Sequence, residues 1–237
     1  MVLTYVMAFA VAMMLTEAIV RARRWPNVTL WWTRALAFNA FQVATAWVAG
    51  LTWEQWLADW RPWTIDGLPI AAQVAIGYVA ITFVYYWWHR WRHEVRLLWR
   101  CVHQLHHSPS RIEVITSFYK HPFEILLNSF LSTAILYLLV GVSREAAAIA
   151  VLVTGVAELF YHWNVRTPYW LGFVIQRPEA HCVHHQRGVH SFNYSDLPVW
   201  DMLFGTFRNP RAWDASCGFG EREELRVAEM LRWKDIA

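Results

Sequence analysis

Long apolar stretches alternate with polar connections along most of this chain. A helix that crosses a membrane needs about 20 mainly apolar residues, and residues 2–20, 70–88, 123–142 and 146–163 each come close to that length. A fifth stretch, residues 35–51, is shorter and carries Asn39, Gln42 and Thr45, which predicts either a weaker span or an interfacial helix. We therefore expect an all-α membrane protein with four to five transmembrane helices.

The remaining segments are more polar and predict a cap on one end of this bundle. The cap comprises residues 89–121 and 164–237, which contain no further apolar stretch of spanning length. The short apolar run 169–175 is expected to lie in the membrane interface. Residues 221–233 predict an amphipathic helix with Leu225, Ala228 and Met230 on one side.

Composition agrees with a membrane protein. Hydrophobic residues make up 57% of the chain, and its 17 Trp and nine Tyr suit the boundary between hydrocarbon and headgroups. The net charge of +3 is small and its basic residues are scattered, so no nucleic-acid binding is expected. Three cysteines without paired spacing predict no disulfide framework. The absence of a basic stretch before residue 2 predicts a retained span rather than a signal peptide.

Arginine placement predicts the orientation of the bundle. The connection after the first span is rich in arginine, whereas residues 52–69 carry Glu54, Asp59 and Asp66 against Arg61 alone. Because short cytoplasmic loops are enriched in Lys and Arg, the first connection is expected in the cytoplasm. Counting spans from there places the cap on the cytoplasmic side as well.

Histidines are confined to the predicted cap and the helix ends next to it. All 11 lie between residues 89 and 190. The motif HRWRH, residues 89–93, places two imidazoles one helical turn apart. The first histidine box, HQLHH at residues 103–107, and the second, HCVHH at residues 181–185, share the spacing i, i+3, i+4. Each box can offer three nitrogens to a common centre.

These motifs together predict a metal site, although a single histidine pair is more often ordinary surface. Imidazole binds Zn, Cu, Fe or Ni, so the ligand type alone leaves the metal open. The number of histidines exceeds the four ligands of one structural zinc and the two axial ligands of a haem. Two neighbouring metals are therefore expected, beside an apolar interior that favours a lipid-like substrate.

The ordered motifs resemble those of the fatty acid hydroxylase and sterol desaturase superfamily of integral-membrane di-iron oxygenases. The matching segments are HRWRH, HQLHH, HPFE at residues 121–124, HWN at residues 162–164, HCVHH, and NYSDLPVWDMLFGTF at residues 193–207. The resemblance covers the chain from about the third span to Phe207.

This resemblance implies two iron ions that use O2 and electrons from a separate ferredoxin, cytochrome or reductase. The implied reaction is hydroxylation or desaturation of a membrane lipid such as a sterol, a fatty acyl chain or an ether lipid. Zinc would be a substitute, because it has no redox chemistry. The implied metal ligands are His89, His93, His103, His106, His107, His162, His181, His184 and His185.

Several further residues are assigned from their positions. Some relatives have a second histidine four residues after His162, where this chain has Arg166, so His190 is a candidate tenth ligand. His121 is expected to begin a helix rather than to bind metal, and Cys182 is expected to pack. Candidates to hold the non-ligating N–H of an imidazole are Glu158, Asn164, Asn193 and Asp201.

Three functions remain open on the sequence alone. A lipid hydroxylase is the leading hypothesis, and a desaturase with the same site is the nearest rival. A membrane metal transporter or sensor would use similar histidines, but it should place them near mid-membrane on a path open to both sides. The predicted histidines instead gather at one face, which favours an enzyme.

Overall fold

The computed structural model describes residues 2–236, and the regular elements in that range are helical. The longer helices are α1 (Val2–Val20), α2 (Trp31–Leu51), α4 (Ile70–Glu94), α7 (Pro122–Ala134) and α8 (Arg144–His162). The shorter ones are α3 (Trp53–Asp59), α5 (Arg96–Leu98), α6 (Gln104–His107), α9 (Pro178–His184), α10 (Pro198–Leu203) and α11 (Val227–Met230). Two π-helical segments, η1 (Trp99–His103) and η3 (Ile135–Val140), and two 3-10 segments, η2 (Val114–Thr116) and η4 (Tyr169–Phe173), complete the set. The prediction of an all-α protein is confirmed.

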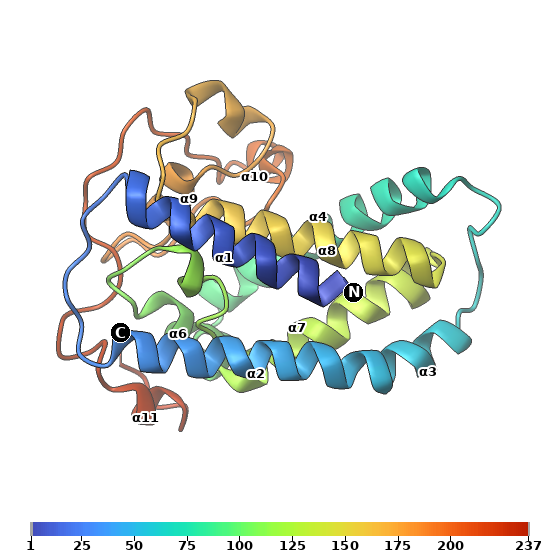
Figure 1. Cartoon of the computed structure of the whole chain (residues 1–237), viewed down its shortest axis with the longest axis horizontal. Coiled ribbons are helices and arrows are strands. Elements are labelled where there is room, and N and C mark those ends of the chain that lie inside the picture. Colours follow the sequence, from blue (N-terminus) through green and yellow to red (C-terminus); the bar gives the residue numbers. More distant parts are fainter. Residues whose placement is uncertain (1, 237) are drawn as a thin grey trace.

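The long helices lie side by side along the longest axis of the molecule, and the irregular cap covers one end of them (Figure 1). Helix α4 packs against α8, and α2 packs against α7. Four helical segments in the described residues are long and apolar enough to cross a membrane: Trp31–Asp59, Ile70–Glu94, Pro122–Val140 and Arg144–His162. The chain is therefore a multi-pass membrane protein.

The first two predicted spans are both helical in the structure. Helix α1 is apolar and, at 19 residues, as long as the last two of these segments. Helix α2 begins earlier than predicted, because Trp31 is buried and its indole N–H donates to Glu113 Oε1 at 2.7 Å. The amide of Asn39 donates to the carbonyl oxygens of Ala35 and Ile115. This polar residue therefore docks α2 against the cap.

The segment predicted as one helix over residues 123–142 changes pitch on the way. Helix α7 passes into the π-helical η3, which ends at Gly141 with a φ of 77°. A Cβ atom at Gly141 would lie 2.4 Å from the carbonyl oxygen of Trp63. Glycine is required at this turn both for its left-handed conformation and for this close approach.

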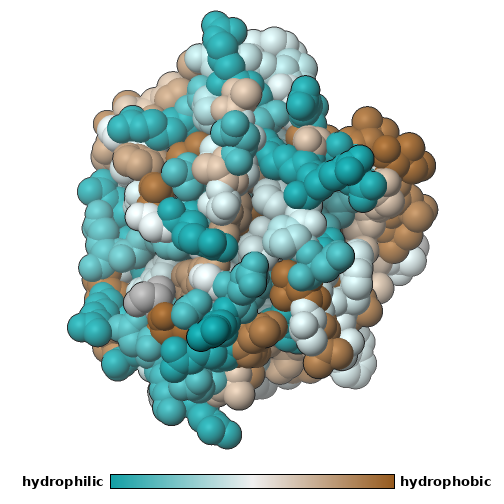
Figure 2. All heavy atoms as spheres, turned by 90° about the vertical axis from the view of Figure 1, so that its left-hand side faces the viewer, coloured by the Kyte–Doolittle hydropathy of each residue, from teal (hydrophilic) through white to brown (hydrophobic). Residues whose placement is uncertain are grey.

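The two ends of the molecule differ in surface character. Large apolar side chains such as Leu36, Phe83, Phe130 and Val151 are exposed along the spans, as expected for side chains that face lipid. Viewed from the cap end, most of the surface is hydrophilic (Figure 2). The cap is therefore the water-facing part of the protein.

The predicted helix over residues 221–233 is wrong. Only α11 is helical there, and Trp233 has a φ of 63°, which an α-helix does not allow. The Glu224 carboxylate instead accepts from the backbone N–H of Ser110 at 3.2 Å, and Met230 is buried while Leu225 is exposed. Tertiary hydrogen bonds to the cap override the local apolar pattern in this segment.

Candidate metal centre

Three of the histidines lie at the ends of long helices. Helix α4 extends past its apolar part to Glu94, so His89 and His93 project from the same face of its last turns. Helix α8 begins at the N-cap Ser143, whose hydroxyl accepts from Ala146 N, and its last residue is His162. The predicted convergence of helix ends is observed for these two helices.

The two boxes lie on short helices in the cap. The first box runs from the end of η1 through α6, and the second occupies α9 and the residue after it. Pro178 begins α9, where its missing N–H is no loss because the first N–H groups of a helix have no intrahelical partner. Both boxes are buried except for Val183, which is half-buried.

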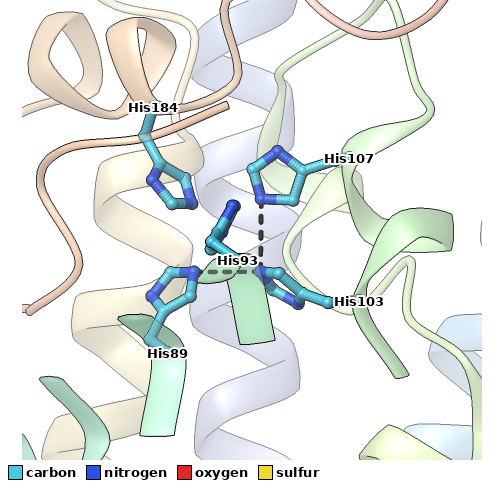
Figure 3. A group of neighbouring side chains, drawn as sticks. All are labelled: His89, His93, His103, His107 and His184. Atoms are coloured by element: carbon cyan, nitrogen blue, oxygen red, sulfur yellow. Dashed lines mark hydrogen bonds between the residues drawn. The ribbon is translucent and has the colours of Figure 1, made fainter. Parts of the chain in front are cut away.

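Nine imidazoles form two neighbouring groups. The five-histidine group contains His89, His93, His103, His107 and His184. The four-histidine group contains His106, His162, His181 and His185. Within each group, one nitrogen of every ring lies within 4.8 Å of the others, and the five rings of the larger group point toward a common centre (Figure 3).

Each box is divided between the two groups, which differs from the expectation that its three histidines serve one centre. The i and i+4 residues of the first box enter the five-histidine group, whereas His106 enters the other group. The second box does the reverse, with His184 crossing over. A helix places residues i and i+3 at different angles around its axis, so a box lying between two centres contacts both.

The nitrogens inside each group approach one another closely. The Nε2 atoms of His89 and His103 are 3.0 Å apart, and those of His162 and His181 are also 3.0 Å apart. Burial lowers the pKa of the box histidines, and that of His184 to about 3. They are therefore neutral at pH 7, which is the state that binds metal.

Unpartnered nitrogens provide a test of whether these residues fit a metal. The Nδ1–H of His184 donates to the carbonyl oxygen of Phe192 at 2.7 Å, which leaves the Nε2 lone pair facing the five-histidine group. That Nε2 is buried and, within residues 2–236, has no hydrogen-bond partner. A buried acceptor of this kind is costly unless something binds it. The donor set therefore fits metal ions of the type that imidazole prefers.

Backbone and carboxylate oxygens hold the outer nitrogens of the five-histidine group. His89 Nδ1 lies 2.8 Å from the carbonyl oxygen of Tyr194. His103 Nδ1 lies 2.9 Å from Glu124 Oε1, and Glu124 also forms a buried ion pair with Arg92. Such partners fix the orientation of a ligating imidazole, and a carboxylate also raises its basicity.

Two of the residues predicted to hold an imidazole N–H, Asp201 and Asn193, instead bind the backbone near the histidines. The Asp201 carboxylate accepts from the backbone N–H groups of Tyr194 and Ser195. Asn193 has a φ of 50°, and its amide donates to the carbonyl oxygens of Ala180 and Arg208. Both side chains fix the loop whose carbonyl oxygens face His89 and His184.

The other two predicted outer residues also differ from expectation. The backbone carbonyl of Glu158, rather than its carboxylate, lies 2.9 Å from His162 Nδ1. The carboxylate pairs with Lys120. The side chain of Asn164 hydrogen-bonds the backbone of Arg23 on both sides and thus anchors the connection after α1.

His190 lies outside both groups. Its Nδ1 is 3.2 Å from His107 Nδ1, so it contacts the five-histidine group and not the group that is one imidazole smaller. Arg166 is exposed and follows the end of α8, so the residue four positions after His162 does not continue its helical face. The predicted helix-start role of His121 is confirmed, because its Nδ1 accepts from Phe123 N at 3.0 Å. Cys182 packs in a small apolar cluster as predicted.

The sequence reasoning missed Glu124 and Arg92. Glu124 is a charged residue in the first turn of an apolar segment of spanning length, and charges in such segments are costly and mark functional sites. Arg92 follows the predicted span 70–88 and carried no such signal. Glu17, whose carboxylate accepts from Val114 N and Asn164 N, carries the same signal within the apolar α1.

The fold and these two groups define a helical membrane protein with a histidine-rich site suited to metal. The family model for fatty acid hydroxylases matches residues 74–206, which is more than half of the chain. The chain belongs to the fatty acid hydroxylase family. No solved structure matches it.

Several proteins of this kind are similar to the chain. Ornithine lipid hydroxylase OlsE of Rhizobium tropici is 37% identical over 150 residues, which cover 61% of this chain and 44% of that protein. Sphingolipid C4-hydroxylase sur2 of Schizosaccharomyces pombe is 25% identical over 68% of this chain and 60% of its own length. Human alkylglycerol monooxygenase is 30% identical over 55% of this chain and 29% of its own. The chain thus spans less than two thirds of the length of these relatives.

Proposed function

We propose that the chain is an O2-dependent, non-haem di-iron oxygenase that hydroxylates a C–H bond of a membrane lipid. The observation that carries this proposal is the pair of adjoining imidazole groups, with five and four nitrogen donors, at the end of apolar helices. Together, the nine imidazoles exceed the four ligands that a single structural zinc takes. The family, and relatives that are named as lipid hydroxylases, support the choice of substrate class.

Each of the two groups would hold one iron ion. Bound iron would supply redox chemistry with O2, using electrons from a separate donor protein. The chain's own residues keep the imidazoles neutral and oriented, through burial and through the carbonyl oxygens of Phe192 and Tyr194. The surrounding spans would present the lipid from the side and keep bulk water away. The arginine-rich first connection favours a cytoplasmic site.

Comparative lipid mass spectrometry tests this proposal. Membranes with the protein should contain a lipid that has gained one oxygen atom, and the oxygen should carry label when the cells are grown under 18O2. Membranes with His106→Ala at equal expression should lack that product. A product that has lost two hydrogens and gained no oxygen would identify a desaturase instead.

Metal content tests the di-iron part separately. Anaerobic loading with ferrous iron should give two iron ions per chain in intact, monodisperse protein. One zinc ion or no metal after loading would contradict the two-metal site whatever the lipid analysis gives.

A further inference from the structure

The two imidazole groups are built unequally. The five-histidine group has one more donor than its neighbour, and the position that could have supplied the difference lies beyond the end of α8. His190, the remaining histidine near the site, contacts the group that already has five. The four-histidine group therefore has one ligand position that its own imidazoles do not fill when both metals have the same coordination number.

The ring nitrogens that face away from each centre also have more hydrogen-bond partners in the five-histidine group. In the five-histidine group, the Nδ1 atoms of His89, His103, His107 and His184 have hydrogen-bond partners, whereas the ring of the fifth member, His93, has a buried Nε2 with no partner among the described residues. In the four-histidine group, His162 and His106 use backbone carbonyl oxygens, the latter at 3.3 Å. The Nδ1 atoms of His181 and His185 are buried and lack any partner among the described residues. Two of its four rings thus have no hydrogen bond on Nδ1 among the described residues, against one of five rings in the other group that makes no hydrogen bond there.

Among the described residues, a carboxylate contacts an imidazole of the five-histidine group but none of the four-histidine group. Glu124 accepts from His103 and is also paired with Arg92, whereas the half-buried Glu158 beside the other group has its carboxylate paired with Lys120. A carboxylate on the outer nitrogen makes an imidazole a stronger donor, and loss of such a partner costs about 10- to 100-fold in metal affinity.

These differences in donor number, outer hydrogen bonds and carboxylate contact all favour the same group. We infer that the five-histidine group holds its metal permanently, whereas the four-histidine group holds the exchangeable metal and carries the open ligand position. This inference rests on the proposed function for the presence of two metals. The reacting oxygen and the lipid C–H bond would then meet at the four-histidine group, on the side of Tyr161, whose ring centroid lies 4.4 Å from that of His181.

Stepwise chelation of the iron-loaded full chain tests the inference. Elemental analysis after graded chelator treatment should show two phases, with the first iron leaving at chelator concentrations about tenfold lower than the second. His162→Ala should load one iron, which leaves in the late phase. His89→Ala should abolish the late phase. Loss of both irons in one phase, or a late phase that His162→Ala removes, would overturn the inference.

A matched pair of acid variants separates the causes. Glu124→Gln should shift the late phase by about tenfold, so that it merges with the early one, because the carboxylate on His103 is lost. Glu158→Gln also alters an acid paired with a cation beside the site, but it should leave the late phase in place. Equal shifts of the late phase in both variants, with monodisperse protein in each, would contradict the role of Glu124.

The outcome remains distinguishable from a failure of the proposed function. If the wild-type chain loads a single iron, the two-metal proposal fails. The inequality is then still tested by which variant abolishes that iron. Loss with His89→Ala and retention with His162→Ala would support it, and the reverse pattern would refute it.

Discussion

The two histidine boxes have identical spacing but different surroundings. The first box has hydrogen-bond partners on several residues. Glu124 contacts His103, and His190 contacts His107. The carbonyl oxygen of Lys234 accepts from the side chain of Gln104. The second box has one outer hydrogen bond from an imidazole, between His184 and Phe192. That one bond belongs to the histidine that crosses into the five-histidine group.

This difference shows that one local motif can build two unlike sites. The exchange of one histidine between boxes also makes each group depend on both boxes, so neither site can form from one box alone. The five-histidine group receives His184, the member of the second box whose Nδ1 has a hydrogen bond. The predictions below either break this comparison or sharpen it.

Neighbouring ligands in the second box should empty different groups, and this is the largest expected effect. We expect His184→Ala and His185→Ala each to reduce the metal content from two ions to one and activity by at least about 100-fold. Combining each change with His162→Ala distinguishes them by elemental analysis. His185→Ala with His162→Ala should retain one metal, and His184→Ala with His162→Ala should retain none. Equal metal content in the two double variants would disprove the division of the box.

The largely desolvated ion pair between Lys120 and Glu158, beside the four-histidine group, should contribute to stability. Lys120→Met leaves the Glu158 carboxylate unpaired in a span and should destabilise the protein by about 3–5 kcal/mol, measured by unfolding in detergent micelles. The double change Lys120→Met with Glu158→Leu should recover most of that loss, since it leaves no unpaired charge. Arg226→Gln, at an exposed pair with Glu229, is the control and should not measurably alter stability. No recovery in the double variant would contradict this account.

Acid should unfold the metal-free protein because its box histidines are buried in the neutral form. The pKa of His184 is about 3 in the folded chain, against 6.5 for an unperturbed histidine. Between these values the unfolded chain binds a proton that the folded chain does not, so the free energy of unfolding decreases as the pH falls from 7 to 5. Denaturant titrations at several pH values measure the slope, and His184→Asn should reduce it. A flat profile would show that these imidazoles are hydrated.

His190 should have the smallest effect of this set. If it positions His107 from outside the group, His190→Asn should still load two metal ions, and the late phase of chelation should shift by about tenfold. Complete loss of one metal would instead identify His190 as a ligand.

Much of the architecture followed from the sequence by itself. Apolar length determined the helical membrane class and most of the spans, and the periodicity of an α-helix was enough to pair His89 with His93. The same local reasoning failed for residues 221–233 and began α2 four residues late, because Met230, Glu224 and Trp31 are held by partners far away in the chain. A periodic pattern contains no information about such partners.

Only the tertiary structure decided how the histidines are divided. Spacing i, i+3, i+4 places three rings along one side of a helix, but which centre each ring reaches depends on where α6 and α9 meet the ends of α4 and α8. The hydrogen bonds on Nδ1 depend on the same packing. Glu124 and Tyr194, for example, lie far in sequence from His103 and His89, the rings that they contact. Helical geometry is a property of neighbours in the chain, whereas the inequality of the two groups is a property of contacts between segments.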